Sequence, residues 1–251
     1  RMLGPNDLAQ GLREVKALGA IAGLAHPFRV GSPMCTGCYW EYSIDDWNAI
    51  DFIEVWSGTL PSVHSSNQRA FALWTEVLNQ GYRVTATCGR DWHVSVPGAV
   101  DPEEPVSVSY VADGRSDPAA AIAAGEVTVT MGPLLMLTVG CSGTEEEGFV
   151  IGIGGTVPSS LQSGVVEACI RLDFERRRTV WSLPEQTLEV RLFANDGIVA
   201  TVSWSYRETS ASVPIQAAGL KWLRAELYGT LKGCRTMIAF TNAIYFESES
   251  N

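Results

Sequence analysis

The chain has no apolar run long enough to cross a membrane and has few cysteines. A spanning helix needs roughly 20 consecutive apolar residues, and residues 1–6 lack the apolar core of a secretory signal. Six cysteines in 251 residues are too few for a disulfide scaffold. We therefore expect a cytoplasmic protein with reduced thiols. Because Arg1 is not an initiator methionine and a helical pattern follows almost at once, we also expect the chain to be part of a longer protein.

Basic residues are scarce as well. The sequence has 18 Lys and Arg against 28 Asp and Glu, which gives a formal net charge of −10. Nucleic acids and anionic membranes attract basic patches, so the charge argues against both and favours a small-molecule substrate or a metal ion. The basic cluster Arg176 to Arg178 lies between strand-like segments and is expected to be a solvated loop. These numbers leave the oligomeric state open.

Two familiar catalytic or metal-binding patterns are incomplete. Cys35 and Cys38 form a single Cys-x-x-Cys, whereas a structural zinc site needs four ligands and no second pair follows at a suitable spacing. We expect a plain loop or a local disulfide there. No serine stands in a Gly-x-Ser-x-Gly turn, which disfavours a serine hydrolase.

The chain divides into two patterns. Strand-like runs alternate with helical patterns up to residue 133, which is typical of a parallel α/β layer or barrel. From residue 134 the apolar residues recur with a period of two, and Gly, Ser, Pro and Asn-Asp-Gly turns connect the segments. We expect a small antiparallel β-sandwich there. The predicted domains are 1–133 and 134–251.

Two of the three histidines lie where predicted strands end. His26 follows the run that begins at Gly23, and Asp91 and His93 follow the run that ends at Cys88. Carboxyl ends of parallel strands meet at one edge of a sheet. A carboxylate with imidazoles suits zinc, manganese or iron, which lower the pKa of bound water toward neutrality. A hydrogen-bonded turn at Asp91 and a core position for His26 are the alternatives that these residues leave open.

Two further polar residues are candidates for the surroundings of such a site. Glu54 lies inside the apolar run Phe52 to Trp56, where an unpaired carboxylate costs several kcal/mol unless a cation or a donor meets it. A structural hydrogen bond and a role in a site are both consistent with this position. His64 lies in the loop 61–66, which we expect to be exposed and able to meet substrate if it reaches the same edge.

The order of these motifs resembles the PHP (polymerase and histidinol phosphatase) superfamily of metallohydrolases, most strongly its carbaryl-hydrolase-like CehA/McbA branch. The resemblance rests on five segments: Ala25-His26-Pro27, Ile53 to Gly58, Gly89 to His93, Trp222 to Leu227 and Thr241 to Tyr245. With residues 67–81 and 125–133, it covers nearly the whole chain.

The resemblance implies a distorted β/α barrel that holds two or three divalent ions (Zn, Mn or Fe) at its strand ends. It implies hydrolysis of phosphate esters or, in this branch, other esters and carbamates by a metal-bridged hydroxide. His26, Asp91 and His93 match metal ligands, and Glu54 matches a position beside the site. We take Asp91, His93 and Arg90 as the catalytic candidates, with Glu54, Ser57 and His64 beside them.

The sequence departs from the family in three places. No histidine precedes His26, so the family's opening His-x-His ligands are absent; Ser57 replaces a usual Asn; and Arg90 replaces a small hydroxyl residue. Arg90 places a cation beside the ligands, which either attracts an anionic substrate or weakens metal binding. We therefore predict a partial β/α barrel followed by a β domain, with weak or no metal retention in this chain.

Two other readings stay open. One is a mononuclear zinc hydrolase with His26, Asp91 and His93 as ligands and water in the fourth position. The other is a non-catalytic binding module on a degenerate PHP scaffold, in which the β half recognises a saccharide or a protein. Metal binding by the purified protein distinguishes the enzyme from the module.

Overall fold

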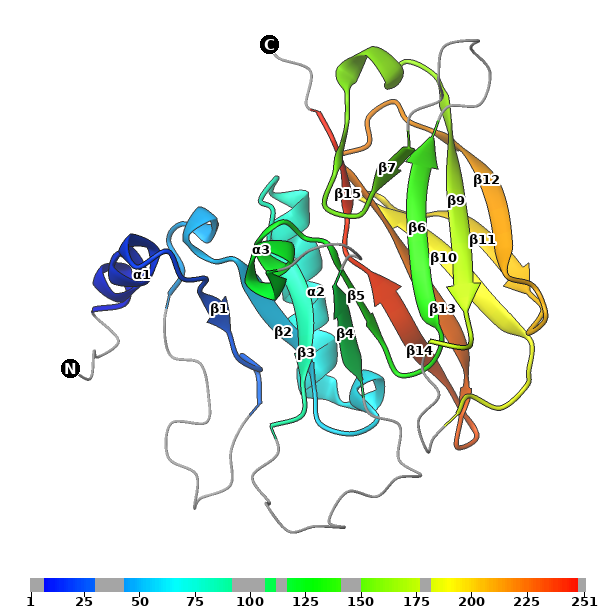
Figure 1. The fold of residues 1–251 in the computed structure, drawn as a ribbon, viewed down its shortest axis with the longest axis horizontal. Helices are drawn as coiled ribbons and strands as arrows, with labels where there is room; N and C mark the ends of the chain where they lie inside the picture. The colour runs from blue at the N-terminus through cyan, green and yellow to red at the C-terminus, as the bar shows by residue number, and fades with distance from the viewer. Residues whose placement is uncertain are drawn as a thin grey trace.

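A computed structural model describes residues 7–29, 43–91, 107–111, 117–140, 150–176 and 182–247 (Figure 1). Of these described residues, 44% lie in strands and 21% in helices. The strands form three sheets, of three, eight and four strands. Within this part of the chain, no helix is both long and apolar enough to span a membrane.

The first sheet is parallel and has the order β1-β2-β3. Its strands are β1 (Gly23–Leu24), β2 (Phe52–Ser57) and β3 (Thr85–Gly89). Helix α1 (Leu8–Ala17) precedes β1, and α2 (Ser65–Asn79) connects β2 to β3. Since the three strands run in one direction, their carboxyl ends lie along one edge, at the bottom of the view in Figure 1.

Helix α2 forms where the sequence spacing predicts it. The side chains of Ala70, Trp74, Val77 and Leu78 recur at helical intervals and are buried. Trp74 Nε1 donates to the Val84 carbonyl at 2.7 Å, which fastens the helix to the segment entering β3. The helix therefore packs on the parallel sheet with its beginning near the carboxyl end of β2.

The two remaining sheets face each other. The larger has the order β11-β10-β13-β14-β5-β4, and β15 pairs with both β13 and β8. Its strands are β4 (Val108–Val111), β5 (Val127–Thr130), β8 (Thr156–Val157), β10 (Leu188–Ala194), β11 (Gly197–Trp204), β13 (Trp222–Leu231), β14 (Cys234–Thr241) and β15 (Ile244–Phe246). The smaller, antiparallel sheet has the order β12-β9-β6-β7.

The strands of the smaller sheet are β6 (Leu134–Gly140), β7 (Val150–Gly152), β9 (Val165–Asp173) and β12 (Ser210–Gln216). Buried and half-buried residues alternate along β6 and β10, as expected for strands with one face toward a core. Strand β6 contacts β13 and β14 across the layers. Helix α3 (Pro118–Ala123) and the short 3₁₀ turns Trp47–Ala49, Pro61–Val63 and Ser159–Leu161 complete the elements.

The predicted β/α barrel is wrong. The described residues form several sheets and close no barrel. Strand β5, which the alternating pattern placed in a parallel sheet, pairs antiparallel with β4 and β14. Its sequence is Val-Thr-Val-Thr, and all four residues are buried. The sequence of such a short buried strand does not show which way its neighbours run. The boundary predicted at residues 133 and 134 stays a prediction, although β4 and β5 share a sheet with β14.

A buried asparagine joins the parallel sheet to the large antiparallel sheet. Asn242, directly after β14, accepts a hydrogen bond from the Ala86 N–H at 2.7 Å and donates to the Ala86 carbonyl at 2.9 Å. It also donates to the Val127 carbonyl at 2.8 Å. One side chain thus connects β3 with β5, two strands that do not pair with each other.

Candidate functional site

Residues from all three parallel strands meet at the carboxyl edge of the first sheet. His26 follows β1, Ser57 ends β2 and Asp91 follows β3. His26 Nε2 lies 4.0 Å from Asp91 Oδ2, and each side chain is 25% exposed. An imidazole and a carboxylate from distant segments therefore face the same space.

An arginine that the sequence analysis missed lies at the same point. Arg29 forms an ion pair with Asp91 Oδ2, and its Nη1 donates to Ser57 Oγ at 3.4 Å. The guanidinium links the loop after β1 to the ends of β2 and β3. The sequence places Arg29 three residues after His26 but contains no pattern that assigns it a partner 62 positions away.

Glu54 points its carboxylate into this site from β2. Its Oε1 is buried and, within the part of the chain that the structure describes, has no hydrogen-bond partner. A Cβ added at Gly89 would lie 2.6 Å from that oxygen, so glycine at this position leaves the space that the carboxylate occupies. Burial raises the pKa of Glu54; Ser57, His26 and Arg29 lower it, and Asp91 raises it further. These five side chains therefore share one electrostatic environment.

Replacing Glu54 by glutamine is expected to stabilise the protein at neutral pH. A carboxyl whose pKa is raised in the folded state takes up protons on folding, so it lowers stability as pH rises from its usual value of 4.5 through the raised pKa. Glutamine does not titrate. We expect the free energy of unfolding of Glu54→Gln to exceed that of the wild type at pH 7.5 and the excess to vanish at pH 4, as measured by urea denaturation. Glu14→Gln, which changes an exposed side chain, is the matched control. If Glu54→Gln differed from the wild type in free energy of unfolding by the same amount at pH 7.5 and pH 4, the expectation would be contradicted.

The backbone is constrained at the same edge. Among the described non-glycine residues, φ is positive at His26 (34°), Leu60 (45°), Asp91 (51°) and Lys232 (47°). The first and third are the two facing site residues, and Leu60 lies in the loop that follows β2. Such conformations cost of order 1–3 kcal/mol each and cluster at functional sites. His26 and Asp91 thus both adopt the left-handed backbone conformation at the point where their side chains face each other.

The loop after β2 is held by a second residue that the sequence analysis missed. Asn67, buried in the first turn of α2, donates to the carbonyls of Ser57 and Pro61, each at 2.9 Å. His64 is exposed, and its Nε2 lies 2.9 Å from the Thr59 carbonyl of its own loop. The structure thus gives Asn67 a positioning role at the end of β2 and His64 a contact within the loop.

The remaining predicted residues are only partly placed. Arg90 is half-buried between Gly89 and Asp91. His93 lies outside the described residues, as do Cys35 and Cys38. Over the ranges that the structure describes, no group of three His, Cys, Asp or Glu side chains is close enough to hold a metal ion. The described part of the site therefore offers two facing ligand-type groups, His26 and Asp91, with Glu54 beside them.

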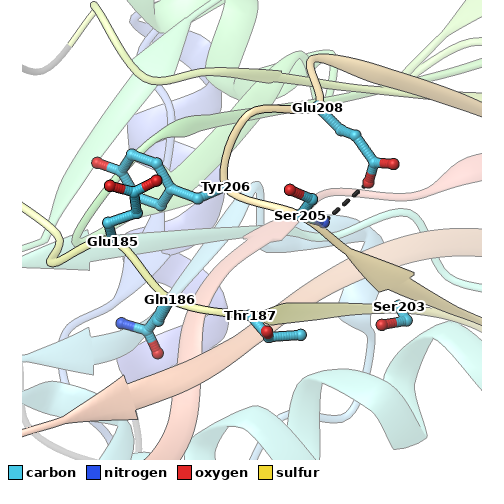
Figure 2. Close-up of a pocket in the computed structure, with 7 residues that line it drawn as sticks. All are labelled: Glu185, Gln186, Thr187, Ser203, Ser205, Tyr206 and Glu208. Atoms are coloured by element: carbon cyan, nitrogen blue, oxygen red, sulfur yellow. Dashed lines mark hydrogen bonds between the residues drawn. The ribbon is translucent and has the colours of Figure 1, made fainter.

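The β half contains a polar cavity of about 530 Å³ where β10 begins and β11 ends (Figure 2). It is lined by Glu185, Gln186, Thr187, Ser203, Ser205, Tyr206 and Glu208. Glu208 Oε2 accepts a hydrogen bond from the Ser205 N–H at 2.8 Å. Hydroxyl, amide and carboxylate groups beside a tyrosine ring are the kinds of group that contact a polyhydroxylated ligand.

Comparisons with known proteins do not assign the chain to a family. No protein-family model matches it, and no curated protein matches its sequence. Among solved structures, the soluble domain of PmoD from Methylocystis sp. ATCC 49242 (Rockwell) is similar over 46% of this chain and 92% of that domain, with 11% sequence identity and a TM-score of 0.33. A likeness at that level carries no conclusion about fold or function.

Proposed function

We propose that the carboxyl edge of β1, β2 and β3 is the site of a metal-dependent hydrolase that acts on an ester, carbamate or phosphoester bond of a small molecule. The observation that carries the proposal is the buried Oε1 of Glu54, which has no hydrogen-bond partner among the described residues and lies beside the facing His26 and Asp91. A native protein rarely buries a carboxylate oxygen without a partner unless an ion or a water meets it. The order of motifs supports membership of the PHP superfamily, although the described residues of this chain close no barrel.

The donor set fits a divalent ion. His26 and Asp91, with His93 as the third ligand, would hold zinc, manganese or iron, which prefer imidazole and carboxylate. His26 Nε2 and Asp91 Oδ2, which lie 4.0 Å apart, are the described atoms that would face such an ion. When bound, such an ion supplies hydroxide near neutral pH.

The other side chains of the site serve substrate and water. Glu54 Oε1 can accept a proton or a hydrogen bond from a water, because no described residue gives it a hydrogen bond. Arg29 holds Asp91 and Ser57 together and, with Arg90, supplies positive charge that would attract an anionic substrate group. The site is thus suited to a substrate whose reaction centre develops negative charge.

The test is a titration of the purified chain with Zn²⁺ or Mn²⁺ in competition with a chromophoric chelator. Since the family's opening ligands are absent, we expect weak, exchangeable binding by the wild type. We expect His26→Ala, Asp91→Asn and His93→Ala each to lower the affinity by at least about tenfold. His64→Ala is the control, because it removes the one histidine of the chain that is not a proposed ligand. Among the described contacts, the His64 side chain contacts only its own loop, so this variant should bind the metal like the wild type.

Hydrolysis completes the test. The metal-loaded protein should hydrolyse 4-nitrophenyl phosphate or 4-nitrophenyl acetate, and the same three variants should lose that activity. Equal metal affinity in His26→Ala, Asp91→Asn and the wild type would overturn the proposal, as would no metal binding at all. In the latter case the polar cavity of Figure 2 favours the second candidate function, recognition of a saccharide by the β half.

A further inference from the structure

A cavity at the opposite end of the parallel sheet is built from segments far apart in the sequence. It has a volume of about 640 Å³ and lies where α2 ends, before β3 begins. Its walls come from residues 78–83, Ser159, the segment leading into β13, strand β15 and Glu247. The size is within the usual range for small-molecule pockets.

Two cations line this cavity, and the described residues give neither of them a carboxylate partner. The guanidinium of Arg83 lies 4.5 Å from the centre of the Tyr245 ring. Lys221 Nζ donates to the Asn79 carbonyl at 3.0 Å. The carboxylate in the lining, Glu247, accepts a hydrogen bond from the Ser159 N–H at 2.9 Å. In a chain of net charge −10, a cavity with two such cations points to an anionic ligand.

The end of α2 is a competing explanation for Lys221. A helix carries partial negative charge at its carboxyl end, and a lysine there stabilises the helix. Lys221 does this by binding the Asn79 carbonyl, while the N–H groups of Gln80, Gly81 and Tyr82 satisfy earlier carbonyls of the helix. Because these donors already satisfy the carbonyls at the end of α2, Lys221 has a structural role there. Arg83 is therefore the principal cation that would bind an anion in the cavity.

A second, smaller cavity of about 210 Å³ shares Arg83 and Tyr245 with the first. The stacked pair therefore lies at the boundary of both cavities. The Tyr245 ring is buried, and burial is the main cause that raises its pKa to about 12. The neutral phenol does not repel an anion at physiological pH. Tyr82 and Leu220, both half-buried, provide the accessible apolar surface of the lining, whereas Leu78 and Phe246 behind them are buried.

We propose that this cavity binds a small organic anion, with its charged group on Arg83 and Lys221 and a flat apolar body against Tyr82 and Leu220. The cavity is independent of the proposed hydrolytic site, which lies at the other end of the parallel strands. A ligand there contacts both the segment before β3 and strand β15, so it ties the parallel sheet to the large antiparallel sheet.

The test uses 1-naphthoate and its neutral counterpart 1-naphthamide, which have nearly the same shape, in calorimetric titrations of the metal-free full chain. One charge-assisted hydrogen bond corresponds to about a tenfold change in affinity. We expect naphthoate to bind at least about tenfold more tightly than naphthamide. Arg83→Gln should remove most of that difference, and Lys221→Gln part of it. Arg207→Gln, which changes an 87% exposed side chain elsewhere, should leave it unchanged.

A measurement on the wild type guards against misfolded variants. Raising the salt concentration should weaken the binding of naphthoate and leave that of naphthamide nearly unchanged, because salt screens only the charged contact. Equal affinity for the two probes, no binding of naphthoate at millimolar concentration, or wild-type affinity in a folded Arg83→Gln would overturn the proposal. None of these results depends on whether the chain binds a metal ion.

Discussion

Asn242→Leu should lower the free energy of unfolding by about 3 kcal/mol or more, because it removes the side chain that hydrogen-bonds two strands in the core. Asn242 is 1% exposed. Its amide is the acceptor for the Ala86 N–H and donates to the carbonyls of Ala86 and Val127. Leucine has a similar size, so the loss reflects unmet hydrogen bonds rather than an empty space.

The cost is largest at the Ala86 N–H. This donor points away from water, and a buried N–H without an acceptor costs about 1–3 kcal/mol. The two carbonyls lose a side-chain donor as well, although the backbone N–H of residue 242 still donates to the Val127 carbonyl. The hydrogen bonds from residue 242 to Ala86 of the parallel sheet are lost. Urea denaturation of the purified variant measures the loss through the transition midpoint at constant slope.

Asn48→Ala is the matched control. Asn48 is exposed, and its amide contacts only Asp46 in the neighbouring turn among the described contacts. Its replacement should change the free energy of unfolding by less than about 0.5 kcal/mol. If Asn242→Leu were as stable as Asn48→Ala, the two sheets would not be held together by this residue.

The sequence predicts the local elements of this fold well and their partners poorly. Periodicity identifies α2, and the turn Asn195-Asp196-Gly197 identifies the β10–β11 hairpin, whose ends pair as Ala194 with Gly197 and Leu188 with Trp204. The sequence also identifies a strand at β5. It contains no information on which strand β5 pairs with, because β14 lies more than a hundred residues later. The barrel prediction failed at that step.

The candidate site shows the same division. His26 and Asp91 follow predicted strands, and parallel pairing is enough to bring them to one edge. Glu54 was detectable as a carboxylate in an apolar strand. Arg29 and Asn67 were not, because their roles come from contacts with Asp91 and with the Ser57 and Pro61 carbonyls, which no motif encodes. Polar residues that act through distant backbone or side-chain partners need the tertiary structure to be recognised.

A buried ion pair holds the other side of α2. Arg224 and Glu226 of β13 have side chains 3% and 2% exposed, with Arg224 Nη2 at 2.8 Å from Glu226 Oε1. Arg224 Nη1 donates to Thr75 Oγ1 on α2 at 2.9 Å, and the Tyr228 hydroxyl donates to Glu226 Oε2 at 2.6 Å. Burial lowers the pKa of Arg224, and Glu226 opposes that shift. Each of these two buried charges therefore has a partner of opposite sign in place of water.

Aromatic rings complete the surroundings of the guanidinium. The centres of four rings lie 4.6–5.5 Å from Arg224 Cζ, and they belong to Phe71, Trp74, Phe193 and Trp222. Cation–π contacts of this kind are strongest where the cation is desolvated. The side chain thus packs between helix α2 and strands β10 and β13, and its removal affects both layers.

Arg224→Met is expected to lower the free energy of unfolding by about 3–5 kcal/mol, because it leaves Glu226 buried and unpaired. Methionine fills much of the space among the rings, so lost charge compensation dominates the effect. The double variant Arg224→Met with Glu226→Gln removes both charges and keeps an acceptor for Tyr228. It should recover most of the loss, because replacing both partners of a buried pair is often close to neutral.

Comparing the single and double variants shows whether the loss of stability in Arg224→Met comes from the unpaired charge of Glu226 or from lost packing around the rings. Urea denaturation should place Arg224→Met well below the double variant, whereas an exposed arginine in an ion pair, Arg207→Met, should change stability by less than about 1 kcal/mol. If the double variant were no more stable than Arg224→Met, the loss would come from packing around the rings. In that case the Arg224–Glu226 pair would not be what anchors α2 to β13.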